Sequence, residues 1–132
     1  MKRLLALFGA ASIALAALSS SPAAAQGKTE LSVYTAYEND FVAAYKKAFE
    51  SAHPEIVINW VRDSTGVVTA KLLAEKDNPR ADVVWGLAVS NVQFLKARDV
   101  LQPYMPVGFD KIPEKFRDSS TPPTWFGNSA WI

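Results

Sequence analysis

Three short apolar runs, each followed by a helical pattern, constrain the fold of this chain more than any other feature. They lie at residues 31–34, 56–61 and 83–85, and β-branched or aromatic residues dominate them. Strands that alternate with helices imply βαβ units, whose right-handed crossovers place the strands parallel in one sheet. The nearly continuous apolar run at 56–61 indicates a strand covered on both faces. We therefore predict an α/β fold with a mostly parallel sheet and helices on both faces.

The stretches between these runs carry the periodicity of amphipathic helices. Phe41, Tyr45 and Phe49 recur at every fourth position, which predicts a helix that ends near His53 and Pro54. Two further helices are expected. The first carries Val68, Leu72 and Leu73 and is closed by Asn78 and Pro79, and the second carries Val92 and Leu95 and is capped by Ser90 or Asn91.

Helical periodicity fades after residue 99. Five prolines punctuate residues 99–123, which predicts a surface loop with one helical turn near residues 113–117. Residues 125–132 are expected to begin another strand.

Residues 1–25 have the pattern of a secretory signal peptide. Lys2 and Arg3 precede an uncharged apolar run at residues 4–18, and the alanines at residues 23–25 supply a cleavage site. The run is shorter than the ~20 residues that a membrane-spanning helix needs. We therefore expect cleavage after the alanines and a soluble mature chain in the periplasm.

Charge and cysteine content argue against several classes of function. Lys2 and Arg3 account for two of the 14 basic residues, so the rest of the chain carries 12 basic and 13 acidic residues, with no basic tract. This balance does not suit a nucleic-acid partner. Because the chain has no cysteine, its stability in an oxidising compartment has to come from an apolar core or a partner.

Three turns that follow the predicted strands are candidates for a binding site. They lie at residues 35–38, 63–66 and 85–88. In an open parallel sheet, ligands bind beyond the carboxyl ends of the strands, where the amides of the following helices point outward. The three turns are therefore expected at one edge.

The second turn has two possible roles. Free amides at the helix start and the hydroxyls of Ser64 and Thr65 can bind the oxygens of a tetrahedral anion, with the helix dipole in support. Gly66 lets a ligand approach the backbone. Alternatively, Ser64 or Thr65 is an ordinary helix cap, which stabilises by ~1 kcal/mol. The two roles use the same amides and are compatible.

The other two turns carry side chains that can contact the organic part of a ligand. Thr35, Tyr37 and Glu38 place a hydroxyl, an aromatic ring and a carboxylate in one turn, although a capping role explains them as well. Trp85 can pack against an organic ligand or stack on a cation, or it can belong to the core.

Catalytic motifs are missing from the sequence. We find no nucleophile elbow, phosphate loop, dinucleotide fingerprint or zinc-protease motif. The turn at residues 63–66 has one residue too many to match the Asp-Thr-Gly of aspartic proteases. The single histidine, His53, lies at a predicted helix end and is expected at the surface. We therefore expect no enzyme activity, no cofactor and no metal site, and a secreted hydrolase remains the weaker alternative.

Four segments together resemble a known family. Residues 31–36, 60–66, 71–76 and 81–86 resemble the N-terminal part of the extracellular solute-binding proteins of ABC importers. Within this family, the chain is similar to the 2-aminoethylphosphonate-binding branch, a sister of the ferric-iron-binding proteins. The resemblance covers residues 30–132.

The resemblance implies two α/β lobes that close over a ligand, which the protein delivers to a membrane permease. The first lobe's half of the cleft would be lined by Thr35, Ala36, Tyr37, Ser64, Thr65, Gly66 and Trp85. Ser64, Thr65 and the amides around Gly66 would hold a phosphonate-like anion. Its organic or amino end would face Tyr37, Glu38 and Trp85.

Members of the family are much longer than this chain. We therefore expect residues 26–132 to form an incomplete N-terminal lobe of a periplasmic binding protein for a small anion, most simply 2-aminoethylphosphonate. A ferric-iron-binding protein and an inactive truncated fragment are the alternatives.

Overall fold

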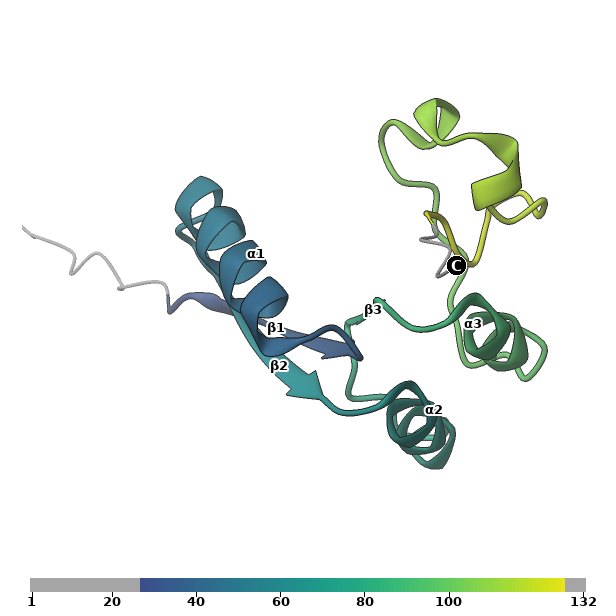
Figure 1. Cartoon of the computed structure of the whole chain (residues 1–132), viewed down its shortest axis with the longest axis horizontal. Helices are drawn as coiled ribbons and strands as arrows, with labels where there is room; N and C mark the ends of the chain where they lie inside the picture. The colour runs from purple at the N-terminus through teal and green to yellow at the C-terminus, as the bar shows by residue number, and fades with distance from the viewer. Residues whose placement is uncertain (1–26, 128–132) are drawn as a thin grey trace, which may run out of the picture.

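A computed structural model of the chain describes residues 27–127, so the expected signal peptide lies outside the described residues. Strands and α-helices alternate along the first two thirds of this part (Figure 1). They are β1 (Thr29–Thr35), α1 (Asn39–Ala52), β2 (Ile56–Arg62), α2 (Thr65–Ala74), β3 (Val83–Trp85) and α3 (Val89–Lys96). Two short 3-10 helices follow, η1 (Phe109–Lys111) and η2 (Glu114–Phe116).

The three strands form one parallel sheet in the order β2-β1-β3. Because β1 lies in the middle, its last residue, Thr35, is paired with Arg62 on one side and with Trp85 on the other. All three carboxyl ends therefore meet at one edge of the sheet.

Helices α2 and α3 cover one face of the sheet. Tyr34 of β1 forms a buried cluster with Val68 and Leu72 of α2 and Leu95 of α3. Leu95 is fully buried, and deleting such a side chain commonly costs about 2–5 kcal/mol. This cluster is the apolar core that a chain without cysteine requires.

Helix α1 packs on the opposite face. Its Tyr45 ring lies 4.7 Å from the ring of Trp85, measured between centroids, and the Trp60 ring lies 5.5 Å from that of Trp85. The predicted α/β class, with a parallel sheet and helices on both faces, is confirmed. Trp60 also keeps its indole Nε1 buried without a hydrogen-bond partner among the described residues.

The helix boundaries correct two details of the prediction. Helix α2 ends at Ala74, before Asn78 and Pro79. Helix α3 begins at Val89 after Ala88, so Ser90 and Asn91 lie inside its first turn and the predicted cap is wrong. The Asn91 amide instead donates a hydrogen bond to Thr69 Oγ1 of α2 at 3.0 Å, a contact that ties the two helices together.

Residues 97–127 form a loop beyond α3 (Figure 1), so the loop predicted at 99–123 is confirmed. Helix η2 is the expected turn near residues 113–117, whereas η1 was not predicted. Of the strand expected at 125–132, residues 128–132 lie outside the described residues, and Phe126 forms an isolated antiparallel bridge with Arg117.

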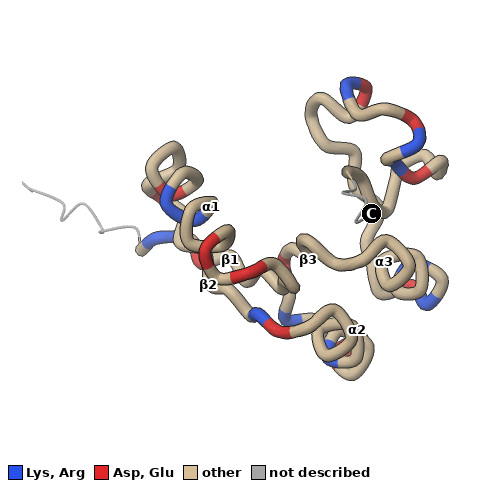
Figure 2. The backbone as a smooth tube through the Cα atoms, viewed as in Figure 1, with Lys and Arg blue, Asp and Glu red and all other residues tan. Residues whose placement is uncertain are grey.

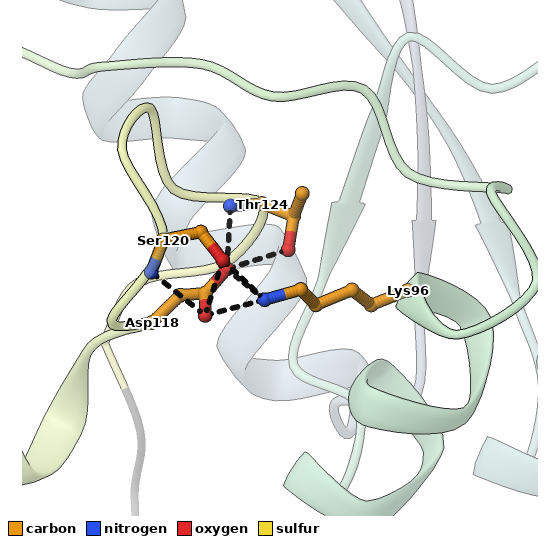
Figure 3. A network of polar contacts seen from close by, with 4 residues as sticks. All are labelled: Lys96, Asp118, Ser120 and Thr124. Carbon is orange, nitrogen blue, oxygen red and sulfur yellow. Dashed lines mark hydrogen bonds and ion pairs between the residues drawn. The ribbon is translucent and has the colours of Figure 1, made fainter.

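A buried carboxylate anchors this loop to α3 (Figure 3). Asp118 accepts hydrogen bonds from Lys96 Nζ at 2.6 and 2.7 Å, and from the amide and hydroxyl of Thr124 at 3.0 and 2.8 Å. Burial alone would raise the pKa of the Asp118 carboxyl, but the bonds from Lys96, Thr124 and Ser120 hold this pKa well below its usual range. The carboxylate is therefore charged at neutral pH, and we call this contact the Lys96–Asp118 latch.

Candidate functional site

The turns that follow β1 and β2 are in direct contact at the carboxyl edge of the sheet. The amide of Asp63 donates a hydrogen bond to the carbonyl oxygen of Thr35 at 3.2 Å, which extends the ladder between the two strands by one step. The turn after β3 begins beside them, since Trp85 is paired with Thr35. The structure therefore brings the predicted site residues of all three turns to one edge.

The turn between β2 and α2 is open to solvent. Ser64 and Gly66 are exposed, and Thr65 is half-buried. Ser64 Oγ accepts the amide of Val67 at 3.4 Å, which is a long capping bond. Among the described residues, the amides of Thr65 and Gly66 and the Thr65 hydroxyl have no hydrogen-bond partner. This turn thus combines a weak cap with several donors that face water.

Thr35 plays a structural part in the turn between β1 and α1. Its side chain is fully buried, and its Oγ1 accepts the amide of Tyr37 at 3.1 Å. Ala36 and Tyr37 are half-buried, while Glu38 is exposed. Thr35 therefore supports the turn from its buried side, and Ala36, Tyr37 and Glu38 supply the accessible surface of the turn.

Tyr37 lies directly against the backbone of Gly86. A Cβ atom on Gly86 would come within 2.3 Å of Tyr37 Cδ2, and the φ of Gly86 is +70°. Only glycine combines this conformation with so close an approach. The positions of Tyr37 and of the turn after β3 therefore depend on each other.

Trp85 belongs to an aromatic cluster that consists of Tyr37, Tyr45, Trp60 and Trp85. The ring centroids of Tyr37 and Trp85 are 4.4 Å apart, a favourable distance for a tilted pair. Trp85 is half-buried, so packing within the cluster accounts for part of its surface and leaves part accessible at the edge.

Arg62 lies among the candidate site residues, and the sequence analysis did not select it. It is the last residue of β2, and it donates hydrogen bonds from Nε to the carbonyl oxygen of Tyr37 and from Nη2 to Glu38 Oε2, both at 2.6 Å. A cation directly before the Asp-Ser-Thr-Gly turn was the available signal. Elsewhere, basic and acidic residues are interspersed over the described chain (Figure 2).

A groove of about 380 Å³ lies between α2 and α3. Of the predicted site residues, only Gly66 lines it, and the remaining lining comes from Thr69, Ala70, Leu73, Ser90, Asn91 and Phe94. The other predicted site residues lie at the carboxyl edge of the sheet and are not part of the lining of this groove.

Residues 27–127 lack two kinds of structural feature. No helix there is long and apolar enough to cross a membrane. No group of three or more histidine, cysteine, aspartate or glutamate side chains in the same range is placed to hold a metal ion.

The chain is similar to known proteins over part of their length. No family model matches the chain. An uncharacterized protein of Haemophilus influenzae is 31% identical over 94 residues, which are 71% of this chain and 27% of that protein. A probable ABC transporter periplasmic-binding protein of Sinorhizobium fredii is 29% identical over 112 residues, which are 85% of this chain and 30% of that protein. The chain thus spans less than a third of the length of either relative.

Solved structures of binding proteins share the fold. The periplasmic binding protein AfuA of Actinobacillus pleuropneumoniae, with fructose 6-phosphate bound, superimposes with a TM-score of 0.65 and 29% identity, over 77% of this chain and 31% of that chain. Ferric iron-binding protein A of Mannheimia haemolytica, in an open conformation, gives a TM-score of 0.60 and 26% identity, over 69% of this chain and 28% of that chain. The described residues therefore have the α/β fold found in periplasmic binding proteins.

Proposed function

We propose that the chain forms part of the periplasmic solute-binding component of an ABC importer and that its ligand is a small anion. The observation that carries the proposal is the set of solvent-facing donors at Ser64, Thr65 and Gly66, at the carboxyl edge of a sheet shared with periplasmic binding proteins. The similarity to a probable ABC transporter periplasmic-binding protein supports the same assignment.

The chemistry of anion capture follows from the start of α2. The amides of Thr65 and Gly66 point out of the first helical turn, where the helix dipole favours negative charge. The Ser64 and Thr65 hydroxyls add two donors that can rotate toward a ligand oxygen. Together these groups replace the water that a phosphonate or phosphate loses on binding.

Among small anions, we assign 2-aminoethylphosphonate or a similar phosphonate as the ligand. In this assignment Tyr37, Glu38 and Trp85 face the organic or amino end, and Thr35 and Ala36 shape the turn that carries them. The fructose 6-phosphate in AfuA is a precedent for a phosphorylated ligand in this fold. Ferric iron is the second candidate, since ferric iron-binding protein A shares the fold.

The other half of the cleft and the contact with the permease belong to the longer protein in this proposal. The relatives are more than three times as long as the segment they share with this chain. Export through the signal peptide at residues 1–25 would deliver the protein to the periplasm.

Calorimetric titration tests the proposed function. The chain is titrated with 2-aminoethylphosphonate, inorganic phosphate, fructose 6-phosphate and ferric iron, and the double variant Ser64→Ala/Thr65→Ala is compared with Ser51→Ala. Ser51 has an exposed hydroxyl on α1 that bonds to the Lys47 carbonyl oxygen, so its loss controls for a missing hydroxyl outside the site.

We expect phosphonate binding that weakens about tenfold or more in the double variant and persists in Ser51→Ala. Binding of iron alone would favour the second candidate. Unchanged phosphonate binding in the double variant would refute the assigned site.

A further inference from the structure

The ion pair between Arg62 and Glu38 joins the two turns of the candidate site. Arg62 is fixed at the end of β2, where it is paired with the buried Thr35. Its guanidinium reaches the turn between β1 and α1, where it donates hydrogen bonds to the Tyr37 carbonyl oxygen and the Glu38 carboxylate, both at 2.6 Å. A charge pair therefore lies at the same edge as the donors of Ser64, Thr65 and Gly66.

The two partners of this pair are held unequally. The Arg62 side chain is 33% exposed and is also held by a backbone carbonyl, whereas the Glu38 side chain is 76% exposed. In the described residues, the Glu38 carboxylate accepts hydrogen bonds from Arg62 alone. Exposed ion pairs contribute little net stability, since water screens them. The carboxylate is therefore the partner that a ligand can replace.

We propose that the Arg62–Glu38 pair recognises a zwitterionic ligand by exchanging partners with it, an inference that rests on the proposed function. The ligand's phosphonate or phosphate group takes the place of Glu38 on the guanidinium, whose planar fork suits two oxygens of such a group. The ligand's ammonium group then pairs with the released carboxylate. Both protein charges stay paired in the complex.

A simple anion cannot satisfy both charges. If it displaces Glu38 from Arg62, the carboxylate is left beside a second negative charge, and the exposed Asp63 adds a third close by along the chain. Repulsion then works against binding. The pair therefore selects an anion that carries an amine over an anion of the same size without one.

The test compares two ligands that differ in one group, 2-aminoethylphosphonate and ethylphosphonate. The intact chain and the variants Arg62→Gln and Glu38→Gln are titrated with each. Arg80→Gln and Glu55→Gln are the controls, because these residues precede β3 and β2 and so lie at the opposite, amino edge of the sheet.

The intact chain is expected to prefer 2-aminoethylphosphonate by about tenfold or more. Arg62→Gln weakens the binding of both ligands. Glu38→Gln weakens 2-aminoethylphosphonate but preserves or strengthens ethylphosphonate, so the preference disappears. The two controls keep the affinity and the preference of the intact chain.

Two results would overturn the inference while the proposed function stands: the preference survives in Glu38→Gln, or Arg62→Gln binds both ligands as the intact chain does. If the intact chain binds neither ligand, the phosphonate assignment within the proposed function fails. Circular dichroism verifies that each variant folds. Should Arg62→Gln unfold, Arg62→Lys replaces it, because lysine keeps the charge but loses the planar fork and is expected to weaken both ligands.

Discussion

Gly86 and Gly66 both border the candidate site, but they differ in their tolerance of a side chain. Gly86 has a φ of +70°, and an added Cβ atom would lie 2.3 Å from the Tyr37 ring. We expect Gly86→Ala to lower the free energy of unfolding by about 2 kcal/mol or more, because it combines backbone strain with displacement of Tyr37. Urea denaturation followed by circular dichroism measures this loss.

Gly66→Ala is the matched variant. A Cβ atom there meets nothing within 4 Å, and the residue is helical, so stability should stay constant or rise by up to about 1 kcal/mol. The new methyl group would nevertheless occupy the space through which an anion approaches the amides, so phosphonate affinity should fall. A loss of stability equal to that of Gly86→Ala, or an unchanged affinity, would contradict this account of the turn.

The sequence indicated some residues of the candidate site but not Arg62. Ser64, Thr65 and Gly66 could be selected because capping residues and glycine before an apolar run have a local signature. Arg62 has only its place before the turn as a local signal. Its partners Tyr37 and Glu38 are more than 20 residues away in sequence and meet it only through the register of β1 and β2.

At the level of elements, local pattern predicted β1, β2, β3 and the first helix well. β-Branched and aromatic residues are enriched in strands, and the run at 83–85 matches β3. The cap of α3 was predicted wrongly because the Asn91 side chain bonds to Thr69 of α2 rather than to its own helix start. Tertiary contacts therefore determined the start of this helix, for which the local sequence preference was ambiguous.

The Lys96–Asp118 latch is an element-level feature with no sequence pattern. Its two ends are separated by 22 residues, most of them in a loop without periodicity. The latch sets where the loop returns to α3, because Asp118 also bonds to Ser120 and Thr124 from within the loop. Loss of the latch should therefore release residues 117–126 and leave the sheet in place.

Asp118→Asn tests this role through pH. The pKa of Asp118 is lower in the folded chain than its ordinary value of ~4, so its contribution to stability is present above about pH 4 and is lost as the pH falls toward the folded pKa. At pH 7 the variant should be less stable by about 2 kcal/mol, below the usual cost of breaking a buried pair because Lys96 is one-third exposed.

Urea denaturation between pH 7 and about pH 2 makes the comparison. The intact chain should lose more stability than Asp118→Asn over this interval. Asp110→Asn, at an exposed position in η1, should follow the intact chain. If the free energy of unfolding falls with pH equally in the intact chain and in Asp118→Asn, the charge of the latch does not stabilise the fold.

For the molecule as a whole, our proposal makes the described residues one wall of a binding site. The three turns share one edge of the sheet, and of their predicted site residues only Gly66 lines the groove between α2 and α3. The chain matches less than a third of each relative, in accord with our proposal that a longer protein supplies the opposing wall. A single wall should bind its ligand weakly, because it leaves much of the ligand in water.

Amide NMR of the isotopically labelled chain, titrated with 2-aminoethylphosphonate, tests the central claim most directly because it detects weak binding residue by residue. We predict saturable shifts for the amides of Thr65, Gly66 and Val67 and for the Arg62 side chain. Shifts confined to Ser90, Asn91 and Phe94 in the groove between α2 and α3, or no shifts at the carboxyl edge of the sheet, would contradict it.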